Sequence, residues 1–394
     1  MTIVEQALSL KEYIAGIHHE IHENPELSLR EFRTTRRIKE EISGLGLVVK
    51  EYEPTGLHVD IKGNLADNGI IVGLRSDIDA LPVCESETAC PRSRNEGVMH
   101  ACGHDANLSM LLGAVRILAE RRNEFSGTVR CLFQPAEEIG QGGRLVLEQG
   151  ACKDVLMFFG MHVAAETPLN AIGFKKGVMG AAVAEFTISI QGKSAPGSSP
   201  DKGQDALVAA CAVVQALQTI VSRRTDPQDP VVLTISSMQA GDPEVNFIPD
   251  RAEIKGNCRF FSAHVSEKIA QWISEIATKA ADAYGARAHT EYELKVPALI
   301  CSDEAVDIAI HSAIDVLGRD AQMFEFGPVM ASEDFSYLAG AVKGAYLEIG
   351  CGLDSGMTHS RFFHSSDKCL PYGAAILATE ALTALRMISD KGKN

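Results

Sequence analysis

The chain has 394 residues, of which 45% are apolar and 23% are charged, and its formal net charge is -15 at pH 7. A chain of this length can bury large cores and is expected to form two domains. The negative charge argues against nucleic acid and against anionic membrane surfaces as partners, because both would repel the protein.

The hydropathy pattern predicts neither a membrane span nor a signal peptide. We find no apolar stretch of the roughly 18 residues that a spanning helix needs, and residues 1–21 are amphipathic and acidic. The ten cysteines lack framework spacing, which fits a reducing compartment. Cys131 and Cys211 lie in apolar runs, so we expect them to be small buried residues of the core. We therefore expect a cytoplasmic protein.

Two helices are expected near the N-terminus, over residues 8–22 and 30–45. The first of them contains His18, His19 and His22. Histidines on a helix pack or pair with neighbours more often than they bind a ligand, so we interpret this cluster as structural.

A buried strand over residues 69–74 leads to two acids, Asp77 and Asp79. Acids that directly follow a buried strand must be paired or lie near cations, so both are candidates for a functional site. A turn with an aspartate cap is the alternative interpretation.

The motif MHACGHD at residues 99–105 comes next, followed by apolar residues at helical spacing over residues 108–118. We expect a loop that leads into a helix, where the Cys102 thiol and the His104 imidazole can face one point. A divalent metal ion commonly occupies such a point. A cysteine that merely packs beside a helix start is the alternative.

Three later strands are expected to deliver further ligand-type side chains where each strand stops. Residues 128–133 lead to Glu137 and Glu138, residues 155–159 lead to His162, and residues 345–349 precede His359. The carboxyl ends of strands in an open parallel sheet share one crevice. Five candidate ligands could converge there, namely Cys102, His104, Glu138, His162 and His359. Their mixed sulfur, nitrogen and oxygen chemistry suits two transition-metal ions better than calcium or magnesium.

Five motifs resemble those of the M20 metallopeptidase family, and most closely its branch of hippurate, N-acyl-amino-acid and auxin-conjugate amidohydrolases. They are HACGHD (100–105), PAEE (135–138), GMHV (160–163), NFIPD (246–250) and SEDF (332–335). The resemblance implies hydrolysis of a carbon–nitrogen bond in a small molecule, most simply the amide of an N-acyl or N-aroyl amino acid. It also implies two divalent ions per subunit, manganese or zinc, with nickel or cobalt as alternatives.

The resemblance divides the acids into separate roles. Glu137 is implied to be the general base and acid, and Glu138 to be a metal ligand. Asp77 is implied to orient the metal ligands, and Asp79 to shape the pocket. This chemistry is sufficient, because Glu137 can take a proton from a metal-activated water and return it to the departing nitrogen. The same resemblance places His22 in a surface turn.

The pattern changes over residues 182–292, where we expect the order strand, helix, strand, strand, helix, strand. This order is that of a ferredoxin-like α+β unit. It interrupts an α/β domain formed by residues 1–181 and 293–394, in which helices flank a mixed, largely parallel sheet. By resemblance, the insertion is a lid that closes over substrate and forms the contact of a homodimer. An independent binding module is the alternative.

The resemblance assigns substrate contacts to Asn246 and Arg259, and Met330 is a further candidate for the substrate pocket. An arginine suits a bidentate contact with a carboxylate, although Arg259 on a strand could equally lie on a solvated face. Met330 is expected to form an apolar wall. The acids Glu333 and Asp334 are expected to order the metal ligands. The expected partner is therefore a small carboxylate-bearing or aromatic substrate.

Two positions depart from the family pattern. Pro196 stands where relatives have a histidine that stabilises an oxyanion across the dimer, and proline donates no hydrogen bond. Losing one such donor typically lowers turnover by roughly a hundredfold to a thousandfold, unless Ser194, Ser198, Asn246 or a metal ion takes over. Asn107 replaces another histidine that is not a ligand, so the metal site should survive while the nearby pocket differs.

Two alternatives to amide hydrolysis stay open. Because of Pro196, charge could develop elsewhere than on a carbonyl oxygen, as in hydrolytic deamination of an activated aromatic amine or amidine. The chain could also be an inactive relative that binds a metal or a ligand, which the complete ligand set beside Glu137 argues against.

Overall fold

The computed structural model describes residues 1–241 and 246–391, and the chain forms two compact units. The first unit comprises Met1–Met179, Leu299–Pro328 and Asp334–Asn394. The second comprises Gly180–Ala298 and Val329–Glu333. The second unit thus extends beyond the expected insertion of residues 182–292, and the chain leaves the first unit twice.

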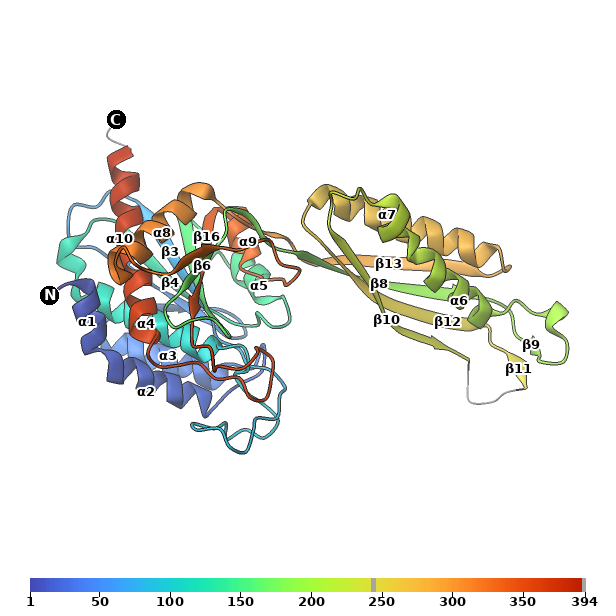
Figure 1. Cartoon of the computed structure of the whole chain (residues 1–394), viewed down its shortest axis with the longest axis horizontal. Coiled ribbons are helices and arrows are strands. Elements are labelled where there is room, and N and C mark those ends of the chain that lie inside the picture. Colours follow the sequence, from blue (N-terminus) through green and yellow to red (C-terminus); the bar gives the residue numbers. More distant parts are fainter. Residues whose placement is uncertain (242–245, 392–394) are drawn as a thin grey trace. The chain divides into compact units, whose positions relative to one another are not determined.

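An eight-stranded mixed sheet forms the centre of the first unit (Figure 1). Its order is β1-β2-β4-β3-β5-β16-β6-β15, and the neighbouring strands β4, β3, β5 and β16 are parallel. The parallel strands end at one edge of the sheet, which brings together the side chains that follow them. The predicted α/β class with a mixed, largely parallel sheet is confirmed. The strands are β1 (Val49–Glu51), β2 (Leu57–Lys62), β3 (Ile71–Asp77), β4 (Thr128–Gln134), β5 (Val155–Ala164), β6 (Ile172–Phe174), β15 (Met323–Glu325) and β16 (Lys343–Gly350).

Helices flank this sheet. Helix α10 packs against both α4 and α8, and all three pack against the central strands, while α1 and α2 pack on α4 and α10. Helices α5 and α9 contact each other and strands β4 and β16. The helices are α1 (Ile3–Ser9), α2 (Lys11–His22), α3 (Phe32–Gly44), α4 (His104–Glu120), α5 (Gly142–Glu148), α8 (Asp303–Leu317), α9 (Ser336–Ala341) and α10 (Leu370–Lys391).

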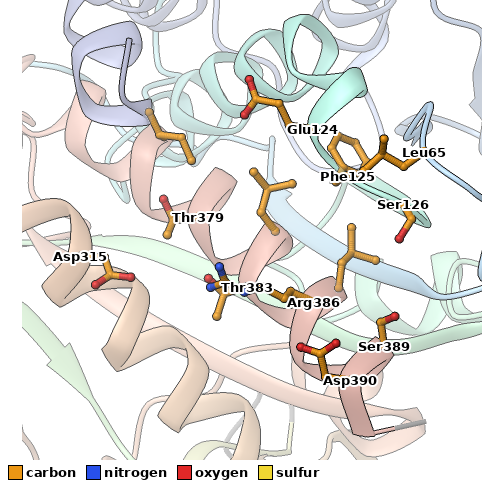
Figure 2. Close-up of a pocket in the computed structure, with 13 residues that line it drawn as sticks. Leu65, Glu124, Phe125, Ser126, Asp315, Thr379, Thr383, Arg386, Ser389 and Asp390 are labelled. Carbon is orange, nitrogen blue, oxygen red and sulfur yellow. The ribbon is translucent and has the colours of Figure 1, made fainter. Parts of the chain in front are cut away.

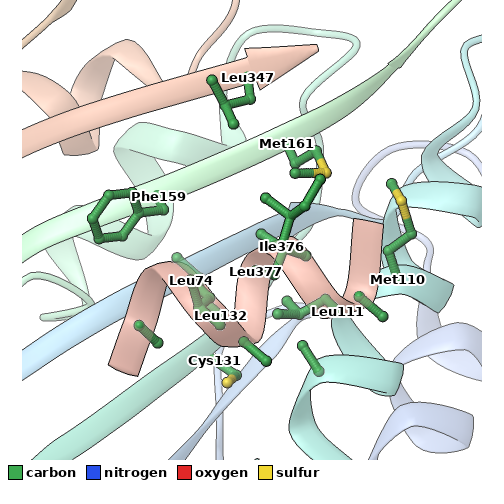
Figure 3. Close-up of a cluster of buried hydrophobic side chains, with 14 of the residues drawn as sticks. Leu74, Met110, Leu111, Cys131, Leu132, Phe159, Met161, Leu347, Ile376 and Leu377 are labelled. Atoms are coloured by element: carbon green, nitrogen blue, oxygen red, sulfur yellow. The ribbon is translucent and has the colours of Figure 1, made fainter. Parts of the chain in front are cut away.

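Buried apolar side chains gather around α10, α4 and the central strands (Figure 3). Leu74 of β3, Leu132 of β4 and Phe159 of β5 are buried, as are Leu111 of α4 and Ile376 of α10. Fully burying such a side chain contributes about 1.5–3 kcal/mol relative to leaving it exposed. This packing fixes α4, and with it the turn that precedes α4, at the edge of the sheet where the parallel strands end.

The N-terminal segment differs from the prediction. The single helix expected over residues 8–22 is two helices, and the chain turns between them at Leu10. Helix α1 begins with a capping box, in which the Thr2 hydroxyl accepts from the Glu5 amide and the Glu5 carboxylate accepts from the Thr2 amide. The prediction that His22 lies in a surface turn is wrong, because His22 ends α2 and is 6% exposed.

The second unit is an antiparallel sheet of four strands in the order β10-β12-β8-β13, with two helices. Alternate residues of β8, among them Phe186 and Ile188, are buried with the apolar faces of α6 and α7. The order of elements confirms the predicted ferredoxin-like fold. The elements are β8 (Ala182–Gln191), α6 (Ala206–Leu217), β10 (Val231–Ala240), β12 (Arg251–Phe260), α7 (Ala263–Asp282) and β13 (Arg287–Val296).

Helix α6 corrects two interpretations of the sequence. Together with the π-helical turn Ile220–Arg224, it forms a helix of 19 residues. By length and composition alone, this helix is long and apolar enough to span a membrane. The prediction that the chain has no such stretch is therefore wrong. Ala209 and Val213 on one face are buried in the core of this unit, as in a core helix. Cys211 is exposed rather than buried, whereas Cys131 is buried as predicted.

Candidate metal centre

The turn before α4 positions Cys102 and His104. Gly103 between them has φ +98°, a left-handed conformation that glycine adopts without strain. A Cβ at this position would lie 2.3 Å from the Val163 side chain, so no larger residue fits without rearrangement. The chain therefore passes close to β5 here, and His104 becomes the first residue of α4.

Asp79 holds the histidine and the glutamates in one arrangement. Its two carboxylate oxygens accept from the backbone amides of Glu137 and Glu138 over 3.1 and 3.0 Å. Its Oδ1 also lies 3.2 Å from His104 Nδ1, and its Oδ2 accepts from the Ser28 hydroxyl over 2.6 Å. Asp79 thus orients the His104 ring so that Nε2 of His104 points away from Asp79. Asp79 also fixes the turn that carries Glu137 and Glu138.

Glu31 supports the same turn from behind. Ala136 has φ +56°, which is strained for a residue with a side chain. Its amide donates to Glu31 Oε1 over 2.9 Å, and Glu31 Oε2 accepts from the Thr55 hydroxyl over 2.6 Å. Glu31 is fully buried, so this contact helps to keep the turn in its strained conformation.

His162 and His359 are the remaining candidate ligands. His162 lies within β5 rather than at its end as predicted, because the strand continues to Ala164. Its Nδ1 lies 2.7 Å from the Val163 carbonyl, and its Nε2 lies 3.5 Å from Cys102 Sγ. His359 has φ +63°, and its Nε2 lies 3.6 Å from Glu138 Oε2.

Six of the predicted residues form three overlapping groups of potential metal-binding atoms, and within each group the atoms lie within 4.8 Å of one another. Two buried atoms at the centre, His104 Nε2 and Glu138 Oε1, lie 3.8 Å apart, and neither has a hydrogen bond within the described residues. Buried polar atoms are normally hydrogen-bonded, so two that face each other without a hydrogen bond fit the presence of a cation. The groups are Cys102, His104 and His162; Cys102, Glu138 and His359; and His104, Glu137 and Glu138.

Asp77 belongs to a buried network beside these groups. Its Oδ2 accepts from Arg75 over 2.7 Å and lies 3.9 Å from His104 Nε2. Arg75 also donates to Asp334 over 3.0 Å and to Gln134 over 3.0 Å. Asp334 is thus linked to Asp77 through Arg75, and its role in ordering the metal ligands stays a prediction. Glu333 belongs to the second unit.

The electrostatics of the cluster favour a positive charge. Burial raises the pKa of Glu138 to about 7. The neighbouring Asp79 and Asp77 raise this pKa further, whereas His104 lowers it. Burial also raises the pKa of the Cys102 thiol. For Asp77, burial is outweighed by His104 and Arg75, which lower its pKa. Thiolate, imidazole and carboxylate ligands together suit transition-metal ions such as zinc or manganese.

The predicted substrate contacts lie in the second unit. Arg259 donates from Nη1 to the Met330 carbonyl over 2.6 Å, so two of these residues contact each other. The Asn246 carbonyl accepts from the Gly197 amide over 2.9 Å. Pro196 is exposed and lies in the two-residue strand β9 (Ala195–Pro196), opposite Phe247 of β11 (Phe247–Ile248).

Sequence reasoning missed several residues that support the site. Glu31, Ser28 and Arg75 were not singled out, although each contacts the site or a residue that holds it. Arg75 stands inside a buried strand next to two acids, and that position could have identified it as their partner. Glu31 and Ser28 lie in a distant N-terminal segment and carry no such local signal.

A hollow of about 480 Å³ elsewhere in the first unit has none of these residues in its wall (Figure 2). It is lined by the end of α10, by Asp315 of α8 and by the segment 124–126. Its wall combines acids, hydroxyls and Arg386 without a histidine or a cysteine. The candidate centre is therefore the cluster around Cys102 and His104.

The chain is similar to known proteins along most of its length. The model of peptidase family M20/M25/M40 matches residues 73–382. An N-acetyl-L-cysteine deacetylase of Bacillus subtilis (strain 168) is 34% identical over 356 residues, which are 90% of this chain and 84% of that protein. The IAA-amino acid hydrolase ILR1-like 2 of Arabidopsis thaliana is 34% identical over 388 residues, 97% of this chain and 87% of that protein.

Solved structures share the whole architecture. The YXEP protein of Bacillus subtilis, described as a dinuclear metal-binding peptidase from the M20 family, matches with a TM-score of 0.83 and 30% identity. The match covers 96% of this chain and 99% of that chain. A structure from methicillin-resistant Staphylococcus aureus matches with a TM-score of 0.91 and 32% identity, covering 97% and 99% of the two chains.

Proposed function

The chain belongs to peptidase family M20/M25/M40 and is a metal-dependent amidohydrolase, and we propose that it hydrolyses the amide bond of N-acyl amino acids. The observation that carries this proposal is the cluster of cysteine, histidine and glutamate atoms around His104 Nε2 and Glu138 Oε1, which face each other over 3.8 Å without a hydrogen bond in the described part of the chain. Two relatives at 34% identity are named for cleaving N-acetyl-cysteine and an amino acid conjugate, which supports this class of substrate.

Five residues would hold two divalent ions, which we propose to be manganese or zinc, with nickel or cobalt as alternatives. Bound there, the ions would lower the pKa of a water molecule and polarise the substrate carbonyl. Two observations support this assignment: His104 Nε2 and Glu138 Oε1 have no hydrogen bond within the described residues, and the ligand groups combine sulfur, nitrogen and oxygen atoms. The proposed ligands are Cys102, His104, Glu138, His162 and His359.

Glu137 is the proposed general base and acid. Its Oε2 lies 3.9 Å from His104 Nε2, and its backbone is held by Asp79, so its carboxylate is kept at the edge of the cluster. It takes a proton from the attacking water as the water oxygen bonds to the amide carbon. It then gives that proton to the nitrogen as the carbon–nitrogen bond breaks, which yields a carboxylic acid and a free amino acid.

Asp77 is proposed to orient His104 and to balance the charge of the bound ions. Its position 3.9 Å from His104 Nε2, with Arg75 and Asn107 on its two oxygens, supports this role. Carboxylates of this kind commonly tune the affinity of a metal site by fixing its ligands.

Substrate recognition is proposed to involve the second unit. Asn246, Arg259 and Met330 are assigned to the substrate, with the Arg259 guanidinium on the carboxylate and Met330 beside the acyl group. The contact between Arg259 and the Met330 carbonyl supports this assignment, because it holds the guanidinium beside the backbone of residue 330. The substrate would then be small, with a carboxylate and an apolar or aromatic acyl group.

The second unit is also proposed to form a homodimer contact. On α6, Leu207 and Val208 are 39% and 45% exposed, and Val232 and Met238 on the edge strand β10 are 38% and 42% exposed. Exposed apolar residues on a helix and on an adjacent sheet edge are a typical basis for association. All ten cysteines are free, which supports a reducing location such as the cytoplasm.

A product assay tests the proposed reaction. Purified protein loaded with manganese or zinc is given hippurate-like amides and, separately, a panel of activated aryl amines, and free amino acid and ammonia are quantified. We expect equal amounts of amino acid and carboxylic acid from the amides. Ammonia from the aryl amines without amide cleavage would show deamination instead, and no product from any compound despite bound metal would show an inactive relative.

A further inference from the structure

A second cluster of histidines and acids lies in the first unit, outside the candidate metal centre. His18 and His22 project from α2, and Asp105 lies in the first turn of α4. All three side chains are buried, with residue exposures of 4%, 6% and 1%. We call His18, His22 and Asp105 the His18 cluster.

Three potential ligand atoms of the His18 cluster converge on one point. Asp105 Oδ2 lies 2.6 Å from His22 Nδ1 and 3.3 Å from His18 Nε2. All three atoms lie within 4.8 Å of one another. In a tetrahedral zinc site with bonds of about 2.0–2.1 Å, neighbouring ligand atoms lie about 3.3 Å apart. One of the two distances already matches, and the other needs to widen by less than about 1 Å.

Each histidine of the cluster is held from behind by a second carboxylate. His18 Nδ1 lies 2.7 Å from Asp367 Oδ1, and His22 Nε2 lies 2.8 Å from Glu85 Oε1. Each outer nitrogen can donate to its carboxylate, and a bound cation would replace the proton that lies between each inner nitrogen and Asp105. A carboxylate, a histidine and then a metal is the common order in protein metal sites, because the outer carboxylate fixes the ring and increases its basicity.

The outer carboxylates are themselves fixed. Glu85 Oε2 accepts from the Ser93 amide over 2.6 Å, and Asp367 Oδ2 lies 2.8 Å from His19 Nε2. A fourth donor is close at hand, since the Ser365 hydroxyl lies 3.1 Å from His18 Nε2. Two imidazoles, one carboxylate and one hydroxyl or water complete a four-coordinate site for a transition-metal ion.

An ion can reach the cluster from solvent. His18, His22 and Glu85 line a hollow of about 570 Å³ together with Cys90 and Ser365. None of the proposed ligands of the catalytic centre lines this hollow. The cluster also attracts positive charge, because the carboxylates of Asp105, Asp367 and Glu85 face the two rings.

We propose that His18, His22 and Asp105 bind a transition-metal ion of the zinc class, separate from the catalytic ions. The ion joins α2 to the first turn of α4, directly after His104. It therefore acts as a structural link that holds the turn carrying Cys102 and His104 against the N-terminal helices. The proposal does not rest on the identity of the substrate.

The test compares zinc content in matched variants. Wild type, His18→Gln, His22→Gln and His19→Gln are stripped with chelator, loaded with zinc, dialysed exhaustively and measured by atomic spectrometry against protein concentration. We expect His18→Gln and His22→Gln to hold one zinc ion fewer per chain than the wild type. His19→Gln, which removes a half-exposed neighbour on the same helix, should hold as many ions as the wild type.

The comparison is a difference between chains, so its outcome does not depend on how many ions the catalytic centre holds. Equal zinc content in all four proteins would overturn the proposal and leave the His18 cluster as a hydrogen-bonded network of protonated histidines. A loss in His19→Gln as well would overturn the assignment, because the ion would then lie on the His18, His19 and Asp367 group.

A second measurement covers the case in which the variants fail to fold. Wild-type crystals soaked in zinc are measured on both sides of the zinc absorption edge. We expect an anomalous difference peak between His18 Nε2, His22 Nδ1 and Asp105 Oδ2. No peak there, in a crystal with peaks at the catalytic centre, would contradict the proposal.

Discussion

Asn107 donates a hydrogen bond from Nδ2 to Asp77 Oδ1 over 2.8 Å, and its own Oδ1 accepts one from the Val163 amide over 3.0 Å. A single buried amide thereby joins the first turn of α4, the end of β3 and the end of β5. These elements carry His104, Asp77 and His162. The residue that replaces the family's histidine is therefore a structural part of the site, and not only a change in its pocket.

We expect Asn107→Ala to weaken metal binding by about 10–100-fold, because Asp77 loses a partner that orients it. The Val163 amide would also be left buried without a partner, which costs about 1–3 kcal/mol of stability. Equilibrium dialysis measures the affinity, and turnover at saturating metal should return towards the wild-type value. An unchanged affinity would contradict the role assigned to Asn107.

Glu138→Gln should change stability in a pH-dependent way when the metal is absent. The pKa of Glu138 is raised from 4.5 to about 7 by burial and by neighbouring acids. Its favourable contribution to folding is therefore fully present below pH 4.5 and is lost as the pH rises through 7. The glutamine variant should be more stable than the wild type at pH 8 by up to about 3 kcal/mol, and the two proteins should be equally stable below pH 4.5.

Urea unfolding in the presence of chelator measures this effect, with Glu148→Gln as an exposed control. The variant should also bind less metal. A variant that is less stable than the wild type at pH 8 would show that the Glu138 carboxylate is not under electrostatic strain in the metal-free chain.

Arg75→Met should destabilise the first unit strongly. The Arg75 side chain is fully buried and pairs with Asp77 and Asp334, so its removal leaves two buried carboxylates without their cation. Breaking such a pair typically costs about 3–5 kcal/mol. Arg144→Met is the matched control, because the Arg144–Glu148 pair is exposed and should change stability by less than about 1 kcal/mol. Equal urea midpoints for the two variants would contradict this account.

Pro196→His tests the departure in the second unit. Pro196 is exposed in β9, so a histidine should fit without loss of stability. A new donor for a developing oxyanion should change the relative turnover of N-acyl amino acids, by up to roughly a hundredfold for amides that lack another donor. Ser198→His, at a neighbouring exposed position, serves as the control. An identical substrate profile in all three proteins would show that position 196 has no bearing on the chemistry.

Much of the fold could be predicted from residue patterns. In the second unit, alternating apolar residues and amphipathic runs predicted the order of elements, and β8 begins at residue 182, where the predicted insertion begins. Apolar runs followed by polar residues also indicated which side chains gather at the sheet edge. These signals are local, because they arise from the period of one strand or one helix.

The remaining features depend on contacts between distant segments. The two ring nitrogens of the buried His22 lie 2.6 Å from Asp105 and 2.8 Å from Glu85, which are both far away in sequence, and no local pattern reveals these contacts. Glu31 reaches Ala136 across a similar separation. The apolar length of the helix over residues 206–224 was missed because polar residues such as Gln215 and Gln218, which are exposed, interrupt its apolar run.

The central claim is that Glu137 transfers the proton in amide hydrolysis at a metal centre that other residues hold. The most direct test measures turnover of an N-acyl amino acid and metal content in the same sample of Glu137→Gln. We predict metal content equal to that of the wild type and a loss of turnover of about 10²–10⁴-fold. Turnover near the wild-type rate with the metal in place would contradict the assignment of Glu137.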